Sequence, residues 1–429
     1  MTDNTVTFAG QVEVNKVELT SVATGKVVDI SKIMLEMNIY EDLFSNYITG
    51  TITVSDSNDL INYFPLVGEE RLDISYKTPG LDDKFGLVEN IFYVYKITDR
   101  SLIREKTQVY IIHFMSEEGF SDQHVKISKG YRGKYSDIVK DIFNDGDALG
   151  SRDEVSKKFK IEETSNAFQM VVPTWSPMKT INWIASRSIT KSGVPNYIFY
   201  QDSFNYNFCS INSLLAQQPS MKFWNTTLNI RQIQDIYKGE EISQYNIVRS
   251  TSNDLVFDVS SRMASGMFSS NMIYCDLLTK SINNQEFDYI DSFSSSKHLN
   301  EFPMNSKKIM RYPKSCTVVY VNHQNMWNDF PSDYPETWVL HRRSLMQQIG
   351  SYKAEITVPG RSDYKVGMII ELEQNTIRNQ TSNEEAEDLM NKGNFLVTSI
   401  VHRIAKNEME DVIEICRDSV ISDINNWKV

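Results

Sequence analysis

The sequence lacks several features that mark common classes of protein. Its four cysteines lie far apart, at 209, 275, 316 and 416, so no CxxC spacing indicates a zinc ribbon or a redox motif. No apolar run approaches the ~18 residues of a membrane helix, and the N-terminus has no basic region followed by an apolar core. We therefore expect free thiols in a protein made in a reducing cytoplasm, with no cleaved signal and no membrane anchor.

The motifs of common enzymes are also missing. The six histidines include no HExxH pair, and there is neither a GxSxG elbow nor a GxxxxGK[ST] phosphate loop. We predict no cofactor, no metal site and no catalytic residue, and hence no enzyme. A carboxylate pair for sugar hydrolysis is defined by its spatial separation, so the sequence leaves that alternative open. The net charge of −12 argues against sequence reading or wrapping of nucleic acid, which requires clustered Lys and Arg, and suits a surface that nucleic acid passes without sticking.

One β-rich pattern occurs twice in the 429 residues. Adding 303 to each residue number from 92 to 116 gives eight identities in 25 positions without a gap. The pairs are Phe92 and Phe395, Val94 and Val397, Ile97 and Ile400, Arg100 and Arg403, Glu105 and Glu408, Val109 and Val412, Ile112 and Ile415, and Ser116 and Ser419. Upstream, residues 52–54 (Ile-Thr-Val) recur at 356–358, and Val67-Gly68 recurs as Val366-Gly367. Two copies of one unit allow three subunits to present six similar units.

Strand signals fill the first copy. β-branched and aromatic residues dominate four runs, at residues 50–55, 71–77, 91–98 and 107–115. Within the second run, Leu72, Ile74 and Tyr76 alternate with Asp73 and Ser75, which predicts a strand with one apolar face. The second copy repeats this alternation at residues 370–373, after a one-residue slip behind the shared Val-Gly.

Residues 125–240 have a different pattern. A helix is predicted at 135–143, and a second helix is predicted to begin at Ser176-Pro177, because serine is a favoured N-cap and proline a favoured first helical residue. Two short strands at 197–201 and 206–211 enclose a turn, which predicts a hairpin. We interpret this region as a mixed α/β insertion.

The second β-unit is placed at 241–429. We expect it to begin near Ser250 with strands at 255–259 and 272–278, and to resume at 343–420. Between about 281 and 335 the composition changes to Ser, Asn, Asp and Lys, which we interpret as a long polar loop or excursion. The acidic run at 383–388 predicts a solvated loop or short helix.

Four stretches carry a family resemblance: residues 172–183, residues 344–360, Val366-Gly367-Met368, and Phe395-Leu396-Val397. Taken in order, they resemble the baseplate hub protein of contractile-tailed, T-even-like phages, which is similar to tail D proteins and to the hub part of type VI secretion spike proteins. The resemblance implies an α+β fold that is predominantly β. It consists of two tail-tube-like β-barrel or sandwich domains, at 1–124 and 241–429, and the mixed insertion domain at 125–240.

The resemblance also implies a structural function. A homotrimer would form a pseudo-hexameric ring that joins the hexameric tail tube to the trimeric central spike and leaves a channel for DNA in transit. The tape measure protein and baseplate wedge components are further expected partners. The expected location is the tail baseplate of a virion, after assembly in the host cytoplasm. The family offers no catalytic residues to carry over.

An open sheet has edges with unpaired backbone groups, and closure into a ring pairs them. We therefore expect residues on the strands of both units to form the ring. The candidate ring-forming residues are Ile52, Val54, Leu72, Ile74, Val94, Ile97, Val109, Ile356, Val358, Ile370, Leu372, Val397, Ile400 and Val412. Three acids on the wet strand faces, Asp73, Glu371 and Glu373, are candidates to line the channel and repel DNA phosphates within a Debye length of ~10 Å. The alternative is that they are ordinary solvated strand residues.

A second class of function stays open from the sequence, namely a host-surface or glycan-binding β protein of a virion. Five tryptophans are candidate sugar platforms, at 175, 183, 224, 327 and 338, although a tryptophan at helical spacing such as Trp183 is more typical of a core. Arg342-Arg343, at the start of an expected helix over 344–349, is either an anion site or two solvated cations, and we favour the second reading.

Overall fold

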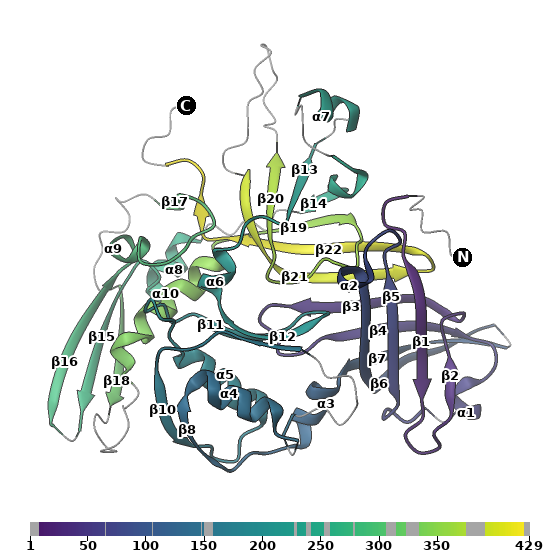
Figure 1. Cartoon of the computed structure of the whole chain (residues 1–429), viewed down its shortest axis with the longest axis horizontal. Coiled ribbons are helices and arrows are strands. Elements are labelled where there is room, and N and C mark those ends of the chain that lie inside the picture. The colour runs from purple at the N-terminus through teal and green to yellow at the C-terminus, as the bar shows by residue number, and fades with distance from the viewer. Residues whose placement is uncertain are drawn as a thin grey trace.

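The computed structural model describes residues 8–64, 66–104, 106–146, 148–149, 158–226, 230–236, 242–252, 258–277, 279–305, 315–322, 334–374 and 391–423. Its main feature is a 13-stranded sheet that runs through both predicted copies (Figure 1). The strand order is β14-β19-β22-β21-β3-β4-β7-β6-β5-β1-β2, with β20 also beside β21 and β13 beside β20. The predominantly β, α+β class is confirmed. Within the described ranges the single chain forms an open sheet and no closed barrel.

The first unit (right in Figure 1) has the strands predicted for it. Its strands are β1 (Glu13–Thr20), β2 (Val27–Asp29), β3 (Met34–Asp42), β4 (Thr49–Asp56), β5 (Arg71–Lys77), β6 (Leu87–Arg104) and β7 (Thr107–Ser116). Its short helices are α1 (Leu60–Tyr63), α2 (Asp83–Gly86) and α3 (Glu117–His124). The alternation in β5 is confirmed, because Leu72, Ile74 and Tyr76 are buried in the core of this unit.

The insertion packs two longer helices against small sheets. Its elements are β8 (Gly130–Lys134), α4 (Tyr135–Asn144), β9 (Lys158–Ile161), β10 (Ala167–Val171), α5 (Pro177–Arg187), β11 (Tyr197–Gln201), β12 (Asn205–Ser210) and α6 (Ile211–Leu215). The predicted N-cap is confirmed, since the Ser176 hydroxyl accepts from the Lys179 amide and Pro177 opens α5. The hairpin is confirmed as well, and Asp202 closes its turn by accepting from the amides of Phe204 and Asn205.

The second unit contains β13 (Met221–Asn225), α7 (Ile230–Ile236), η1 (Gln244–Asn246), β14 (Ser250–Ser252), β19 (Tyr352–Pro359), β20 (Ile369–Gln374), β21 (Gly393–Ala405), β22 (Glu408–Arg417) and β23 (Ser419–Val420). β13 falls in the range 125–240 but pairs with β20, so this sheet begins earlier in the chain than residue 241. The acidic run at 383–388 and residues 255–257 of the strand expected at 255–259 lie outside the described residues, and Val259 begins a helix.

The region interpreted as a polar loop is folded where the structure describes it. It contains α8 (Val259–Ser265), β15 (Ser269–Asp276), β16 (Ser281–Asp288), α9 (Tyr289–Phe293), β17 (Phe302–Pro303), β18 (Cys316–Asn322), η3 (Pro335–Thr337) and α10 (Val339–Ile349). β16, β15 and β18 form a separate sheet (left in Figure 1), so the loop interpretation of 281–335 was wrong for these strands, and the strand near 272–278 does not belong to the main sheet. The polar composition misled because β16 is an edge strand held by backbone pairing to the more apolar β15.

Candidate assembly interface

The two copies share strand order and register. In the first unit Ile52 on β4 lies opposite Ile112 on β7, which lies opposite Ile97 on β6. In the second unit Ile356, Ile413 and Ile400 on β19, β22 and β21 stand in the same relation. Both long strands are also interrupted at the same point, between Val94 and Lys96 and between Val397 and Ser399, which are 303 residues apart. The duplication predicted from sequence is therefore present in the backbone.

The gapless offset of 303 does not hold on the following strand. Ile112 corresponds to Ile413, an offset of 413 − 112 = 301, so the predicted matches of Val109 with Val412, Ile112 with Ile415 and Ser116 with Ser419 were wrong. The cause lies in β6, where two further register shifts, at Thr98/Ser101 and Leu102/Arg104, lengthen the hairpin relative to β21–β22. Glu105 lies outside the described residues.

The predicted slip behind the shared Val-Gly is confirmed. Gly68 and Gly367 both have positive φ, of 92° and 81°. The amide of Val94 then bonds the Glu70 carbonyl, two residues past its glycine, whereas that of Val397 bonds the Met368 carbonyl, one residue past. Leu72 lies opposite Phe92 as Ile370 lies opposite Phe395, so Asp73 and Glu371 occupy equivalent positions. The copies differ in the next strand, because β1 is antiparallel to β5 and β13 is parallel to β20.

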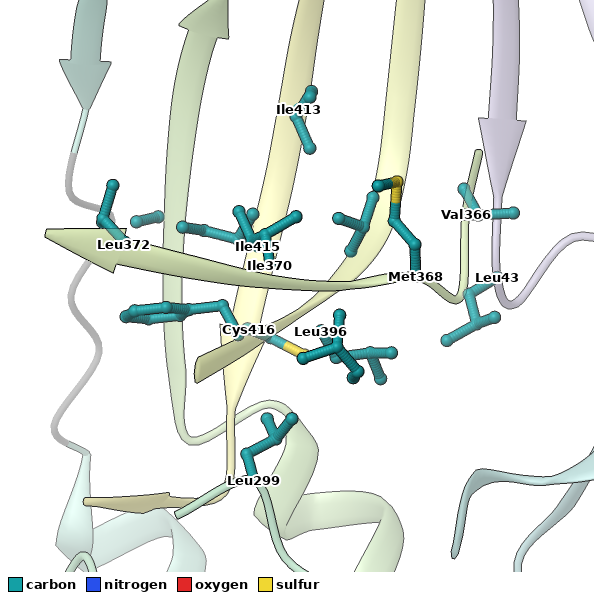
Figure 2. Close-up of a cluster of buried hydrophobic side chains, with 14 of the residues drawn as sticks. Leu43, Leu299, Val366, Met368, Ile370, Leu372, Leu396, Ile413, Ile415 and Cys416 are labelled. Atoms are coloured by element: carbon teal, nitrogen blue, oxygen red, sulfur yellow. The ribbon is translucent and has the colours of Figure 1, made fainter. Parts of the chain in front are cut away.

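The units join edge to edge within the chain, where residues 399–404 of β21 pair with residues 37–42 of β3. We call this joint the internal seam. Side chains from each unit pack in the core of the other unit across it. Leu43, just after β3, packs in the core of the second unit beside Val366 and Met368 (Figure 2). Ile404 and Met409, from β21 and β22, pack in the core of the first unit.

Buried charges lie at the internal seam. The Nδ1 atom of His402 is 2.8 Å from Oδ1 of Asp411, and its Nε2 atom is 3.8 Å from Oε1 of Glu41. Burial alone lowers the pKa of His402, but the two carboxylates outweigh it and raise the pKa to about 10. The Ser203 hydroxyl, from the turn of the insertion hairpin, also bonds Glu41. The insertion thereby holds the seam from one side.

The half of β6 that corresponds to the paired half of β21 is open in the single chain. Tyr95 is 40% exposed, whereas its counterpart Thr398, in the same bulge, is buried and offers its carbonyl to the Leu43 amide. Leu102 lies opposite Gln108 as Ile404 lies opposite Met409, yet Leu102 is 72% exposed and Ile404 is 0% exposed. Among the described residues, this strand edge is thus paired in the second unit and has no strand beside it in the first. We call residues 95–103 the open edge.

All fourteen candidate ring-forming residues lie on strands of the main sheet. Eleven are buried in the two cores, while Ile97, Val109 and Val412 are half-buried. These side chains form the cores beneath the sheet. The edges at which units can join are formed by backbone N–H and C=O groups. The acids are paired: Asp73 with Arg71 at 3.0 Å, Glu371 with Lys222 at 3.5 Å, and Glu373, only 5% exposed, with Lys222 and Lys392.

The reading of Arg342 as a solvated cation was wrong. It points inward and donates to the carbonyls of Ala185, Pro195 and Tyr197, at 3.3, 3.2 and 3.0 Å. Burial, with some repulsion from Arg187, lowers its pKa to about 10. The described tryptophans are built into the fold: Arg187 stacks on Trp183 and lies over Trp338, and Trp224 is buried. Trp327 lies outside the described residues.

Sequence reasoning missed the Glu41, His402 and Asp411 cluster. A signal existed in β22, where every second residue from 409 to 415 points into the core. Three of these four residues are apolar, and the fourth is Asp411. Among the described residues, no group of three or more metal-ligating side chains is placed to hold an ion. In the same ranges no helix is long and apolar enough to cross a membrane.

Comparison with known proteins gives matches at the level of structure. A tail protein from Neisseria meningitidis MC58 is 9% identical with a TM-score of 0.55, covering 95% of this chain and 97% of its own. The 43 kDa tail protein of prophage MuSo2 from Shewanella oneidensis is 11% identical with a TM-score of 0.53, covering 94% and 99%. No family model and no curated protein matches the sequence. The chain has the fold of these phage tail proteins, which confirms the fold expected from the resemblance.

Proposed function

We propose that this chain is a structural hub of a phage tail baseplate or of a related injection machine. Three copies form a pseudo-hexameric ring that joins a hexameric tail tube to a trimeric spike and leaves a channel for DNA. The fold shared with two phage tail proteins over nearly the whole chain supports the tail location. The role we propose is structural and involves no catalysis.

The observation that carries the ring is the contrast between the internal seam and the open edge. The second unit uses the outer half of β21 to hold β3, and the first unit presents the same half-strand of β6 uncovered. An uncovered edge is a template for another strand, and a chain with one donor and one acceptor unit can repeat the joint head to tail until it closes. Three chains then supply six units, the number suited to a sixfold tube.

Light scattering on the purified chain, alone and with its spike, tests the proposal. A hub gives three times 49.5 kDa, and images along the axis show six similar lobes around a hole. A chain that stays monomeric under both conditions, or a trimer with no central opening, contradicts it. The glycan-binding alternative gains no specific support, since the described tryptophans serve packing.

In the proposed ring, Asp73 and Glu371 line the channel. They occupy equivalent positions in the two units. Each is paired with one cation, Asp73 with Arg71 and Glu371 with Lys222, so the six carboxylates of a trimer would repel the phosphates of passing DNA in part only, over about a Debye length. Glu373 contributes less to this field, because it is nearly buried and held by two lysines.

A further inference from the structure

The tip of the β6–β7 hairpin carries an exposed apolar pair. Leu102 and Ile103 are 72% and 63% exposed, although branched aliphatic side chains are usually buried. The equivalent of Leu102 is Ile404, which is fully buried in the core of the neighbouring unit. In the second unit the equivalent residue, Ile404, anchors the internal seam. In the described part of its own chain, Leu102 has no unit beside it to enter.

The second unit offers the matching acceptor edge. Thr251 on β14 lies opposite Ile356 on β19, as Met37 on β3 lies opposite Ile52 on β4, so β14 takes the place of β3. Met37 is the residue that lies opposite Ile404 in the internal seam. If the same register is repeated between two copies, Leu102 of one copy lies opposite Thr251 of the next. β14 is the last strand at its end of the described sheet, so its outer edge is available.

A cavity of about 740 Å³ lies beside this edge. Ile230, Ile247, Pro359 and Phe8 give it an apolar lining, and Arg249 reaches it from the residue before β14. Two branched aliphatic side chains fit its chemistry. In the internal seam, the tip of β21–β22 likewise lies against the segment before β1, through the Asn407 carbonyl and the Val12 amide.

We propose that the β6–β7 hairpin of one copy docks beside β14 of a second copy, with Leu102 and Ile103 in the cavity lined by Ile230, Ile247 and Pro359, which presupposes the ring proposed above. The contact repeats between chains what Ile404 does within one chain. In half of the seams of the ring the two units then belong to one polypeptide. The other half join two chains and depend on this apolar anchor.

Two cysteine variants in separate chains test the contact. Leu102→Cys mixed with Thr251→Cys, the position opposite Leu102 in the proposed register, should give, on mild oxidation, a disulfide-linked pair of chains that neither variant gives alone. The control replaces Thr251→Cys by Ile282→Cys on the separate three-stranded sheet, which is 74% exposed and therefore more accessible than Thr251, so accessibility alone would favour the control pair. Equal yields from the two mixtures would overturn the docking.

The second test places charges at the two anchor residues and measures the dissociation of the trimer. The double variant Leu102→Asp with Ile103→Asp should raise the concentration at which trimers dissociate at least tenfold, while circular dichroism stays that of the folded chain. Ile282→Asp should leave dissociation unchanged. If the unaltered chain is trimeric and the double variant dissociates no more readily, the docking is wrong and the ring stands. If the unaltered chain never forms trimers, the ring and the docking are both wrong.

Discussion

The Nδ1 atom of His402 lies 2.8 Å from Oδ1 of Asp411, and both side chains are buried where the two β-units of the chain meet. Glu41, from the first unit, faces the same imidazole. A protonated His402 between two carboxylates is thus an ionic link across the internal seam.

The link predicts a pH dependence of stability. Since the folded pKa of about 10 lies above the ordinary value of 6.5, His402 stabilises the fold fully below about pH 6.5, and this contribution is lost as the pH rises toward 10. His402→Gln, which leaves two buried carboxylates without their cation, should lower the free energy of unfolding at neutral pH by about 3–5 kcal/mol. Urea titrations at pH 6.5 and 9.5 should show the difference between variant and parent shrinking at high pH.

His113→Gln is the control for this titration, because burial lowers the pKa of His113 rather than raising it. Its difference from the parent should not shrink between these two pH values. A His402→Gln difference that is the same at both pH values would show that His402 carries no charge in the fold.

The two equivalent glycines should differ in their tolerance of alanine. Both have positive φ, which costs an alanine about 1–2 kcal/mol. A Cβ at Gly68 would meet nothing closer than 3.7 Å, whereas one at Gly367 would lie 2.7 Å from the Tyr200 hydroxyl. Gly367→Ala should therefore cost about 1–3 kcal/mol more, measured by urea unfolding. Combining it with Tyr200→Phe, which removes the hydroxyl, should recover that excess; equal costs for the two glycines would contradict the clash.

Arg342 should matter more than its neighbour. Arg342→Met removes the guanidinium donor from three carbonyls at the joint between α10 and the insertion, of which that of Ala185 keeps the Ser188 amide, and this should cost about 1–3 kcal/mol of unfolding free energy. Arg343→Met, the adjacent change of the same chemistry, should stay within about 0.5 kcal/mol of the parent. Thermal or urea unfolding of both variants checks the contrast, and similar losses at both positions would rule it out.

Neutralising the paired strand acids tests the channel. Asp73→Asn with Glu371→Gln should leave the mass of the trimer unchanged and slow the release of DNA from particles rebuilt with the variant, more so at low salt. Glu163→Gln, in the insertion, removes a charge elsewhere and should leave release unchanged. Release at the parental rate from the double variant would remove these residues from the channel.

Much of the fold was predictable because its signals are local. The alternation in β5, the Ser176-Pro177 start of α5 and the Asp202 turn depend on residues close in sequence. The match of Val94 with Val397 succeeded for the same reason, since both precede the same bulge. The match of Ile112 with Ile415 failed because the irregularities in β6 shift the next strand by two residues, a displacement that keeps each side chain on its face.

The candidate assembly interface was less predictable, because it depends on contacts between distant segments. Nothing near Glu41 in the sequence announces His402, 361 residues later, as its neighbour. Ser281 to Asp288 looked like a loop since an edge strand can be polar when a neighbour supplies its backbone partners. The exposure of Leu102 gains its meaning only once Ile404 is seen buried at the equivalent place.

The pairing of β21 with β3 inside one polypeptide would also set the order of steps in the proposed assembly. Joining the units by a peptide chain gives their encounter a high effective concentration, so this joint forms as the monomer folds. The proposed six-unit ring would then require three molecules to meet, where six separate ones would otherwise have to collide. Its yield falls far less steeply as the protein is diluted in the cell.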